Sequence, residues 1–189
     1  ESFFNLNGNF NTGVYNVFGT GSGDQLNAAF FPQNQAGDVR LVHPSYATDI
    51  AANDDRISKA TLRNAPVSIA GLSSNRDVWV YTSSTAPVPV IRNEELILIY
   101  AEASIQNNDL SNAVTALNKI RNGHNLPNYS GVVTQAALID EMLKQRRYSL
   151  FFEGHRWIDI RRYNRIVTLP VDRAGDDIWT AFPLPNTEQ

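Results

Sequence analysis

The chain has 189 residues, of which 42% are hydrophobic, so it can bury one core but is short for two domains of ordinary size. Its 16 basic and 19 acidic residues give a formal net charge of −3, which provides no broad positive field to attract a nucleic-acid backbone. The absence of cysteine excludes disulfides, thiolate metal ligands and cysteine nucleophiles.

The first half, residues 1–90, is rich in Asn, Gly, Ser and Thr and shows no sustained helical period, which is typical of loops and short strands. Residues 16–24 contain three closely spaced glycines but lack the strand and helix that flank a dinucleotide-binding loop. Residues 78–81 form a short run that favours β structure. Pro87 and Pro89 then remove two backbone donors, and we expect a boundary between two different halves there.

The second half, residues 91–189, is predicted to be helical. Apolar residues cover most of the circumference of residues 92–106, which predicts a largely buried helix. The spacing of apolar residues predicts another helix over 110–122, with Asp109 as its N-cap and Gly123 just after its end. Because the connection is short, the two helices are expected to form an antiparallel hairpin.

A third helix is expected to begin after Thr134, whose hydroxyl can cap it, and to run to about Glu153. Gly154 should bend or interrupt it before helical spacing resumes over 155–163. Alternating prolines in residues 182–186 predict an extended tail laid over the helices. The fold class is therefore mainly α, with a helical scaffold and a loop-rich, short-strand N-terminal half.

The densest cluster of charge and aromaticity surrounds Trp157. Its acids, Glu153 and Asp159, could indicate glycoside hydrolysis, which uses two carboxylates. Guanidinium groups nearby favour the charged form of both acids, which suits ion pairing better than general acid catalysis. We interpret the cluster as architecture, with Trp157 filling the core and the acids pairing with Arg156, Arg161 and Arg162.

Other catalytic or metal chemistry has little support. Glu95 and Glu102 share one helix face, but two turns separate them by about 10 Å, which is too far for a retaining glycosidase pair and marginal for an inverting one. The histidines at 43, 124 and 155 have no metal-ligand spacing. We expect no enzyme activity, no metal and no cofactor.

Ligand capture without chemistry needs exposed aromatic faces beside amide and carboxylate groups. Such residues occur in the first half, within the glycine-rich stretch and the β-favouring run. The alternative is that the large aromatic side chains are ordinary packing residues. The candidate ligand contacts are Tyr15, Asn16, Phe18, Asp24, Trp79 and Tyr81.

Four stretches carry recognisable motifs: an Arg-led helix that ends in Tyr-Ala-Glu-Ala (92–103), a Leu-Asn-x-Ile-Arg-like segment (116–121), the segment that contains Glu-Gly-His-Arg-Trp (145–162) and a Pro-x-Pro-x-x-Glu ending (183–188). Together they resemble the SusD/RagB family of nutrient-binding lipoproteins. Asp54 and Arg56 resemble an Asp-x-Arg step of the family, whereas Gln145 stands where the family more often has Glu. The motif residues are Arg92, Glu95, Glu102, Arg121, Glu153, Gly154, Arg156, Trp157, Asp159 and Arg161.

The resemblance implies a tetratricopeptide-like helical scaffold that captures an oligosaccharide at the outer membrane and delivers it to a SusC-like TonB-dependent transporter. Peptide capture, as in the RagB branch, and a helical-repeat scaffold that binds proteins remain open alternatives. Members of the family are longer at the N-terminus and carry a lipid anchor. The expectation is therefore that residues 1–189 form one C-terminal region whose membrane association depends on an anchor outside this sequence.

Overall fold

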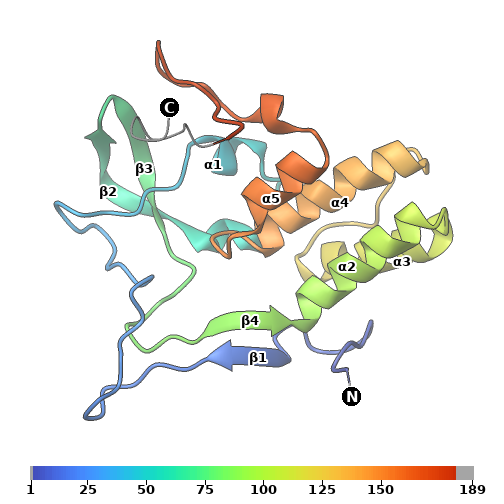
Figure 1. The fold of residues 1–189 in the computed structure, drawn as a ribbon, viewed down its shortest axis with the longest axis horizontal. Helices are drawn as coiled ribbons and strands as arrows, with labels where there is room; N and C mark the ends of the chain where they lie inside the picture. Colours follow the sequence, from blue (N-terminus) through green and yellow to red (C-terminus); the bar gives the residue numbers. More distant parts are fainter. Residues whose placement is uncertain (1, 182–189) are drawn as a thin grey trace, which may run out of the picture.

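The computed structural model describes residues 2–181 and is mainly helical, with short strands (Figure 1). The expected tail and the Pro183 and Pro185 motif lie outside the described residues. In chain order the elements are β1 (Gly13–Asn16), α1 (Ser45–Asp49), the 3-10 helix η1 (Asp55–Lys59), β2 (Ala60–Ile69), β3 (Leu72–Val78), β4 (Val88–Arg92), α2 (Asn93–Gln106), α3 (Leu110–Gly123), α4 (Gln135–Ser149), α5 (His155–Arg162) and the 3-10 helix η2 (Ile166–Thr168).

The helix starts follow the predicted caps. The Asp109 carboxylate accepts a hydrogen bond from the backbone N–H of Asn112 at 3.3 Å, and the Thr134 hydroxyl accepts one from Ala137 at 3.3 Å. α4 ends at Ser149, and Gly154 separates it from α5 with a φ of 86°. The expected interruption between these two helices is confirmed.

Gly123 has a different role from the one predicted. It is the last residue of α3 and does not follow the helix. A Cβ at this position would lie 2.3 Å from the ring of Phe10, so glycine allows the N-terminal segment to pack against the helix end.

One apolar core lies between α2, α3 and α4, with α2 and α3 forming the predicted helical hairpin (Figure 1). α2 is less completely buried than its sequence predicts, because Ile99 is 43% exposed. Within residues 2–181, no helix combines the length and the apolar character needed to span a membrane. The buried members of this core are Ile97, Leu98, Ala101, Ile105, Ala113, Ala116, Leu117, Ile120, Leu138, Met142, Leu143 and Leu150.

The strands form two antiparallel pairs, β1 with β4 and β2 with β3. β4 includes Pro89 and leads directly into α2, across the position at which the sequence suggested a boundary. The β-favouring run at 78–81 contributes only Val78 to a strand, although the N–H of Trp79 still bonds to the Lys59 carbonyl at 2.8 Å beside the last β2–β3 pair.

A second, smaller core joins the first half to the end of α4. Tyr46 of α1 packs edge-on against Tyr148, with ring centroids 5.0 Å apart, and lies 4.4 Å from the ring of Phe151. Its hydroxyl donates to the Arg56 carbonyl at 2.9 Å. This packing places α1 beside the α4–α5 junction, where the candidate site lies.

Candidate functional site

The C-terminal end of α4 is capped by cations from elsewhere in the chain. Lys59 donates to the carbonyl oxygens of Tyr148 at 3.0 Å and Ser149 at 2.6 Å, and Arg92 donates to the Ser149 carbonyl at 2.7 Å. The last carbonyls of a helix have no partner within it and carry partial negative charge. The three contacts therefore stabilise the helix end and fix where α4 stops.

Arg56 completes this cap from a buried position. It binds Asp54 through two hydrogen bonds, at 2.8 and 2.7 Å, and the side chains of both residues are 1% exposed. It also donates to the side chains of Gln145 at 2.7 Å and Ser149 at 2.9 Å. Gln145 thus serves as a neutral acceptor for a guanidinium that Asp54 already neutralises.

Arg92 connects the start of α2 to the α4–α5 turn. It forms ion pairs with Glu94 and with Glu153, the latter at 2.8 Å. Glu94 also lies 2.7 Å from His124. Burial lowers the pKa of His124, and the charge of Arg56 adds to this effect.

Four further motif residues have charged partners, whereas Arg156 and Arg161, the expected partners of Glu153 and Asp159, form no ion pair within the described residues. Asp159 binds Arg146 at 2.7 Å and Arg162 at 3.0 Å. Burial opposes the charge of Glu102, but hydrogen bonds from Arg162 and Tyr163 outweigh it and lower the pKa of this carboxyl. Two further ion pairs are His155 with Glu95, at 3.6 Å, and Arg121 with Glu141, at 2.5 Å.

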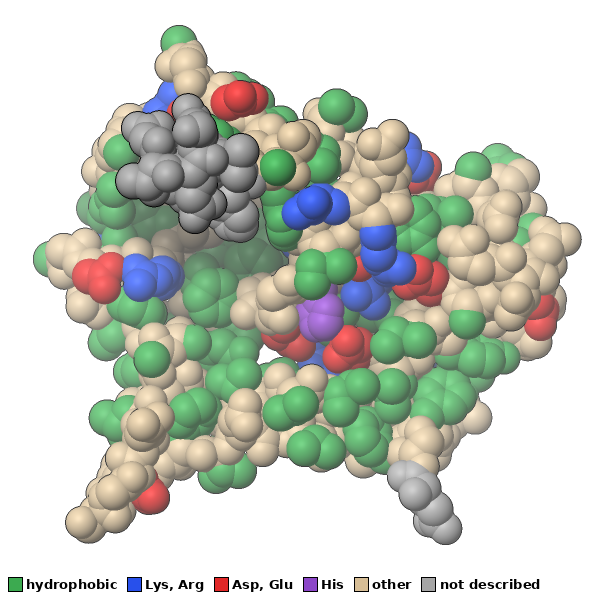
Figure 2. Space-filling view, in the orientation of Figure 1, with side chains coloured by type: hydrophobic (Ala, Val, Ile, Leu, Met, Phe, Trp, Pro, Cys, Tyr) green, Lys and Arg blue, Asp and Glu red, His purple; other side chains and the backbone are tan. Residues whose placement is uncertain are grey.

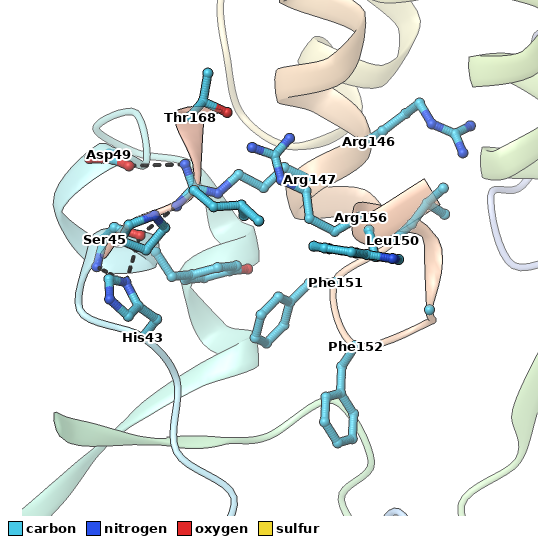
Figure 3. Close-up of a pocket in the computed structure, with 15 residues that line it drawn as sticks. His43, Ser45, Asp49, Arg146, Arg147, Leu150, Phe151, Phe152, Arg156 and Thr168 are labelled. Atoms are coloured by element: carbon cyan, nitrogen blue, oxygen red, sulfur yellow. Dashed lines mark hydrogen bonds and ion pairs between the residues drawn. The ribbon is translucent and has the colours of Figure 1, made fainter. Parts of the chain in front are cut away.

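A cavity of about 580 Å³ lies beside the capped helix end and is hereafter called the aromatic pocket (Figure 3). Trp157 and Phe152 line it and are 41% and 39% exposed, while Phe151 lies deeper. The lining residues come from α1, the α4–α5 junction and the segment around η2. They are His43, Ser45, Tyr46, Asp49, Arg146, Arg147, Leu150, Phe151, Phe152, Gly154, Arg156, Trp157, Thr168, Leu169 and Pro170.

The prediction that Trp157 fills the core is wrong. Ile160 is the fully buried apolar residue of α5, whereas Trp157 borders the pocket. The reason is local, because α5 begins at His155 and no preceding helical turn covers the indole. The guanidinium of Arg161 lies 5.8 Å from the ring centre of Trp157, a cation–π distance.

Phe152 has an unusual backbone conformation. Its φ of 65° lies in the left-handed region, which costs a residue with a side chain about 1–2 kcal/mol. Its ring packs 6.3 Å from that of Tyr81, and the Arg92–Glu153 ion pair holds the adjacent residue. Strained residues of this kind cluster at ligand-binding sites.

Polar groups line one wall of the pocket. Arg147 donates to Asp49 at 2.9 Å and to the Ser45 hydroxyl at 2.9 Å, as Figure 3 shows. The hydrogen bond from Arg147 lowers the pKa of Asp49. Arg146 points away from this wall (Figure 3), and its guanidinium pairs with Asp159. Hydrogen-bonding groups therefore stand opposite aromatic rings.

The six ligand contacts expected from the sequence lie elsewhere. The pocket-lining residues include none of them, although Tyr81, which is buried, packs against Phe152. Trp79 is half-buried, with its ring 6.1 Å from Phe30. Asp24 accepts from the N–H of Gly21 at 3.1 Å and closes its own loop.

The first-half candidates are only partly brought together. Tyr15 and Tyr81 both lie near the Arg92–Glu153 pair, and burial raises the pKa of both hydroxyls. Asn16 is exposed and Phe18 is half-buried in the glycine-rich stretch. Over residues 2–181, no group of three or more His, Asp or Glu side chains is arranged to hold a metal ion.

Sequence reasoning missed Phe151, Phe152, His43 and Tyr46. A usable signal was present, since residues 151–157 contain three aromatic side chains around a glycine that interrupts the helix. Such a break leaves aromatic residues without the neighbours that a continuous helix would supply.

Comparison with known proteins identifies the fold. Residues 32–182 match the SusD family. The chain belongs to the SusD family. SusD-like protein P38 of Formosa agariphila is 28% identical over 167 residues, which cover 82% of this chain and 29% of that protein.

Solved SusD structures share this fold. A SusD-like carbohydrate binding protein from Bacteroides vulgatus is 21% identical with a TM-score of 0.51, covering 64% of this chain and 26% of its own. A SusD superfamily protein from the same organism is 23% identical with a TM-score of 0.50, and the match covers 65% of this chain and 29% of that protein. The chain thus spans less than a third of the length of these relatives. The predicted family and the mainly helical fold class are confirmed.

Proposed function

We propose that this chain is part of a non-catalytic protein of the cell surface that binds an oligosaccharide in the aromatic pocket and delivers it to a SusC-like TonB-dependent transporter of the outer membrane. Membership of the SusD family supports a role in nutrient binding. One relative of the same fold is described as carbohydrate binding. The observation that carries the proposal is the pair of partly exposed rings, Phe152 and Trp157, at one cavity.

The shape and chemistry of the pocket suit a sugar. Sugar rings have apolar C–H faces that stack on aromatic rings, while their hydroxyls need donors and acceptors close by. Ser45, Asp49 and Arg147 provide such groups on the wall that faces the rings. A cavity of about 580 Å³ lies within the usual range for small ligands, roughly 300–1,000 Å³.

The carboxylates support binding without hydrolysis. Among the described residues that line the pocket, Asp49 is the one carboxylate, and it is paired with Arg147. Glycoside hydrolysis ordinarily needs two acids in different protonation states across one bond. The acids of the helical motif, Glu153 and Asp159, are held in ion pairs by Arg92, Arg146 and Arg162.

Calorimetry on a panel of oligosaccharides and peptides, combined with product analysis, tests the proposal. We expect binding of a glycan without product release, and a loss of about tenfold or more in affinity for Trp157→Ala. Trp179→Ala is the matched control, since this tryptophan is 58% exposed and does not line the pocket. Recovery of a TonB-dependent transporter with the protein from membranes tests the delivery step.

Three results would contradict this function. Binding of peptides alone would favour the peptide alternative, and release of sugar products would show an enzyme. Binding of protein partners only, with no small ligand, would favour the helical scaffold.

A further inference from the structure

A basic hollow adjoins the aromatic pocket. It has a volume of about 210 Å³ and lies where α4, α5 and η2 meet. Four cations line it, Lys144, Arg147, Arg156 and Arg165, with Asp140 as the accompanying carboxylate. Arg147, Arg156 and Thr168 line both spaces, so the two adjoin each other. Figure 2 shows basic side chains gathered over α4 and α5, in a chain whose net charge is −3.

Most cations at this junction already have a carboxylate partner. Arg165 pairs with Asp140 at 2.7 Å, and Arg147 pairs with Asp49 at 2.9 Å. Arg146, which also borders the pocket, is neutralised by Asp159. Because each of these pairs is neutral, the net charge at this junction depends on the residues that are not in ion pairs.

Arg156 stands apart from these pairs. Within residues 2–181 its guanidinium forms neither an ion pair nor a hydrogen bond, although the side chain is half-buried between the pocket and the hollow. Burial lowers the pKa of Arg156, and the charge of Arg147 lowers it further. Nearby Asp159 opposes this shift but pairs directly with Arg146 and Arg162, and arginine stays protonated in proteins, so a charge without a direct partner remains at this junction.

We propose that Arg156 binds an anionic group of the ligand, so that the site takes an acidic oligosaccharide that carries carboxylate or sulfate. This rests on the proposed function and names its substrate class. The planar guanidinium matches the paired oxygens of either group and can donate two parallel hydrogen bonds. The anion then compensates the charge of Arg156 in the basic hollow, while the sugar ring lies on Trp157 and Phe152.

The order of the two spaces suits such a ligand. A charged substituent of a sugar projects from the edge of the ring, whereas stacking uses the face of the ring. The exposed rings of Phe152 and Trp157 line only the larger space, and Lys144 and Arg165 line only the smaller one. Arg156 lines both spaces, at the place where the sugar ring of the proposed ligand would join its charged substituent.

The test uses oligosaccharides that contain uronate or sulfate, each with a neutral counterpart of equal length, either methyl-esterified or desulfated. Calorimetry at low and high salt is expected to show a preference of about tenfold or more for an acidic member, weakened by salt. Arg156→Gln is expected to remove this preference and Arg156→Lys to restore part of it. Arg40→Gln is the control, because this exposed arginine lies outside both spaces.

The outcomes separate this inference from the function on which it rests. In one outcome, glycans bind and Trp157→Ala weakens their binding, but acidic glycans bind no more tightly than neutral ones, or Arg156→Gln keeps the preference for them. The anion site is then wrong and the capture function stands. If no saccharide of either kind binds, both fail. Binding of a peptide carboxylate through Arg156, without any glycan, would overturn the sugar assignment.

Discussion

Arg92 donates a hydrogen bond to the carboxylate of Glu153 at 2.8 Å, although 61 residues separate them in the chain. The contact joins the N-cap of α2, a helix of the main core, to the turn that carries Phe152. The same guanidinium caps α4 through the Ser149 carbonyl. The position of the pocket rings is therefore coupled directly to the packing of the helical hairpin.

Removing Arg56 should strongly destabilise the fold. Arg56→Met leaves Asp54 as a buried carboxylate without its partner, and breaking such a pair costs about 3–5 kcal/mol. Arg40→Met breaks the exposed pair with Asp38 and should cost about 1 kcal/mol or less. Urea unfolding of both variants checks the difference. Equal losses would mean that the Asp54–Arg56 pair does not hold the first half to α4.

Lys59 should make stability rise with pH. Burial lowers its pKa from 10.5 to about 7, and the charge of Arg92 contributes to this shift. Between these pH values the unfolded chain binds a proton that the folded chain does not, so the free energy of unfolding increases as pH rises through this window. Its contribution is constant below the folded pKa and above the unfolded one.

Lys59→Met should flatten that dependence between pH 7.5 and 9.5, measured by urea unfolding at both values. Lys119→Met, at an exposed position on α3, is the matched control and should keep the wild-type slope. A Lys59→Met protein with the full wild-type slope would show that another group is responsible.

Alanine substitutions at Trp157 and Ile160, both on α5, should differ in their effects on stability and on ligand binding. Trp157→Ala is expected to change stability by only about 1 kcal/mol, because the indole is 41% exposed, but to weaken ligand binding. Ile160→Ala removes a fully buried side chain and should cost about 2–5 kcal/mol. Thermal and urea unfolding measure both. A larger loss of stability for Trp157→Ala than for Ile160→Ala would show that the tryptophan belongs to the core.

Any side chain introduced at Gly154 should lower the stability of the protein. Its φ is 86°, and no atom lies within 4 Å of an added Cβ, so the cost is conformational and not steric. Gly154→Ala is expected to destabilise the protein by about 1–2 kcal/mol, and Gly154→Asn by less, since asparagine enters the left-handed region more easily. Equal stability of the wild type and Gly154→Ala in urea would refute this role.

The helical half could be predicted well because its signals are local. Asp109 and Thr134 cap helices from neighbouring positions, and Gly154 interrupts the chain through its own backbone freedom. Trp157 shows the limit of this reasoning. Trp157 lies three residues before Ile160 and so shares a helix face with it, but whether that face is covered depends on which segments pack against it.

The pocket could not be predicted because its walls come from distant parts of the chain. Arg147 reaches Ser45 across 102 residues and Asp49 across 98. No spacing rule relates such positions. Tyr15, Phe18 and Trp79, which are half-buried in the first half, remain candidates for additional ligand contacts. Alanine variants at these positions can be compared with variants in the aromatic pocket.

The cap on α4 also bears on the order in which the protein folds. α2 and α3 are joined by three residues, so the core between them closes a short loop, whereas Lys59 and Arg92 reach Ser149 across 90 and 57 residues. We expect hydrogen exchange to show the amides of α2 and α3 protected longer than those of 54–59 and 150–154. Early protection of the latter segments would contradict this order. In the expected order, the ligand site is the last part of the molecule to assemble and the first to open. A bound ligand would therefore slow its unfolding.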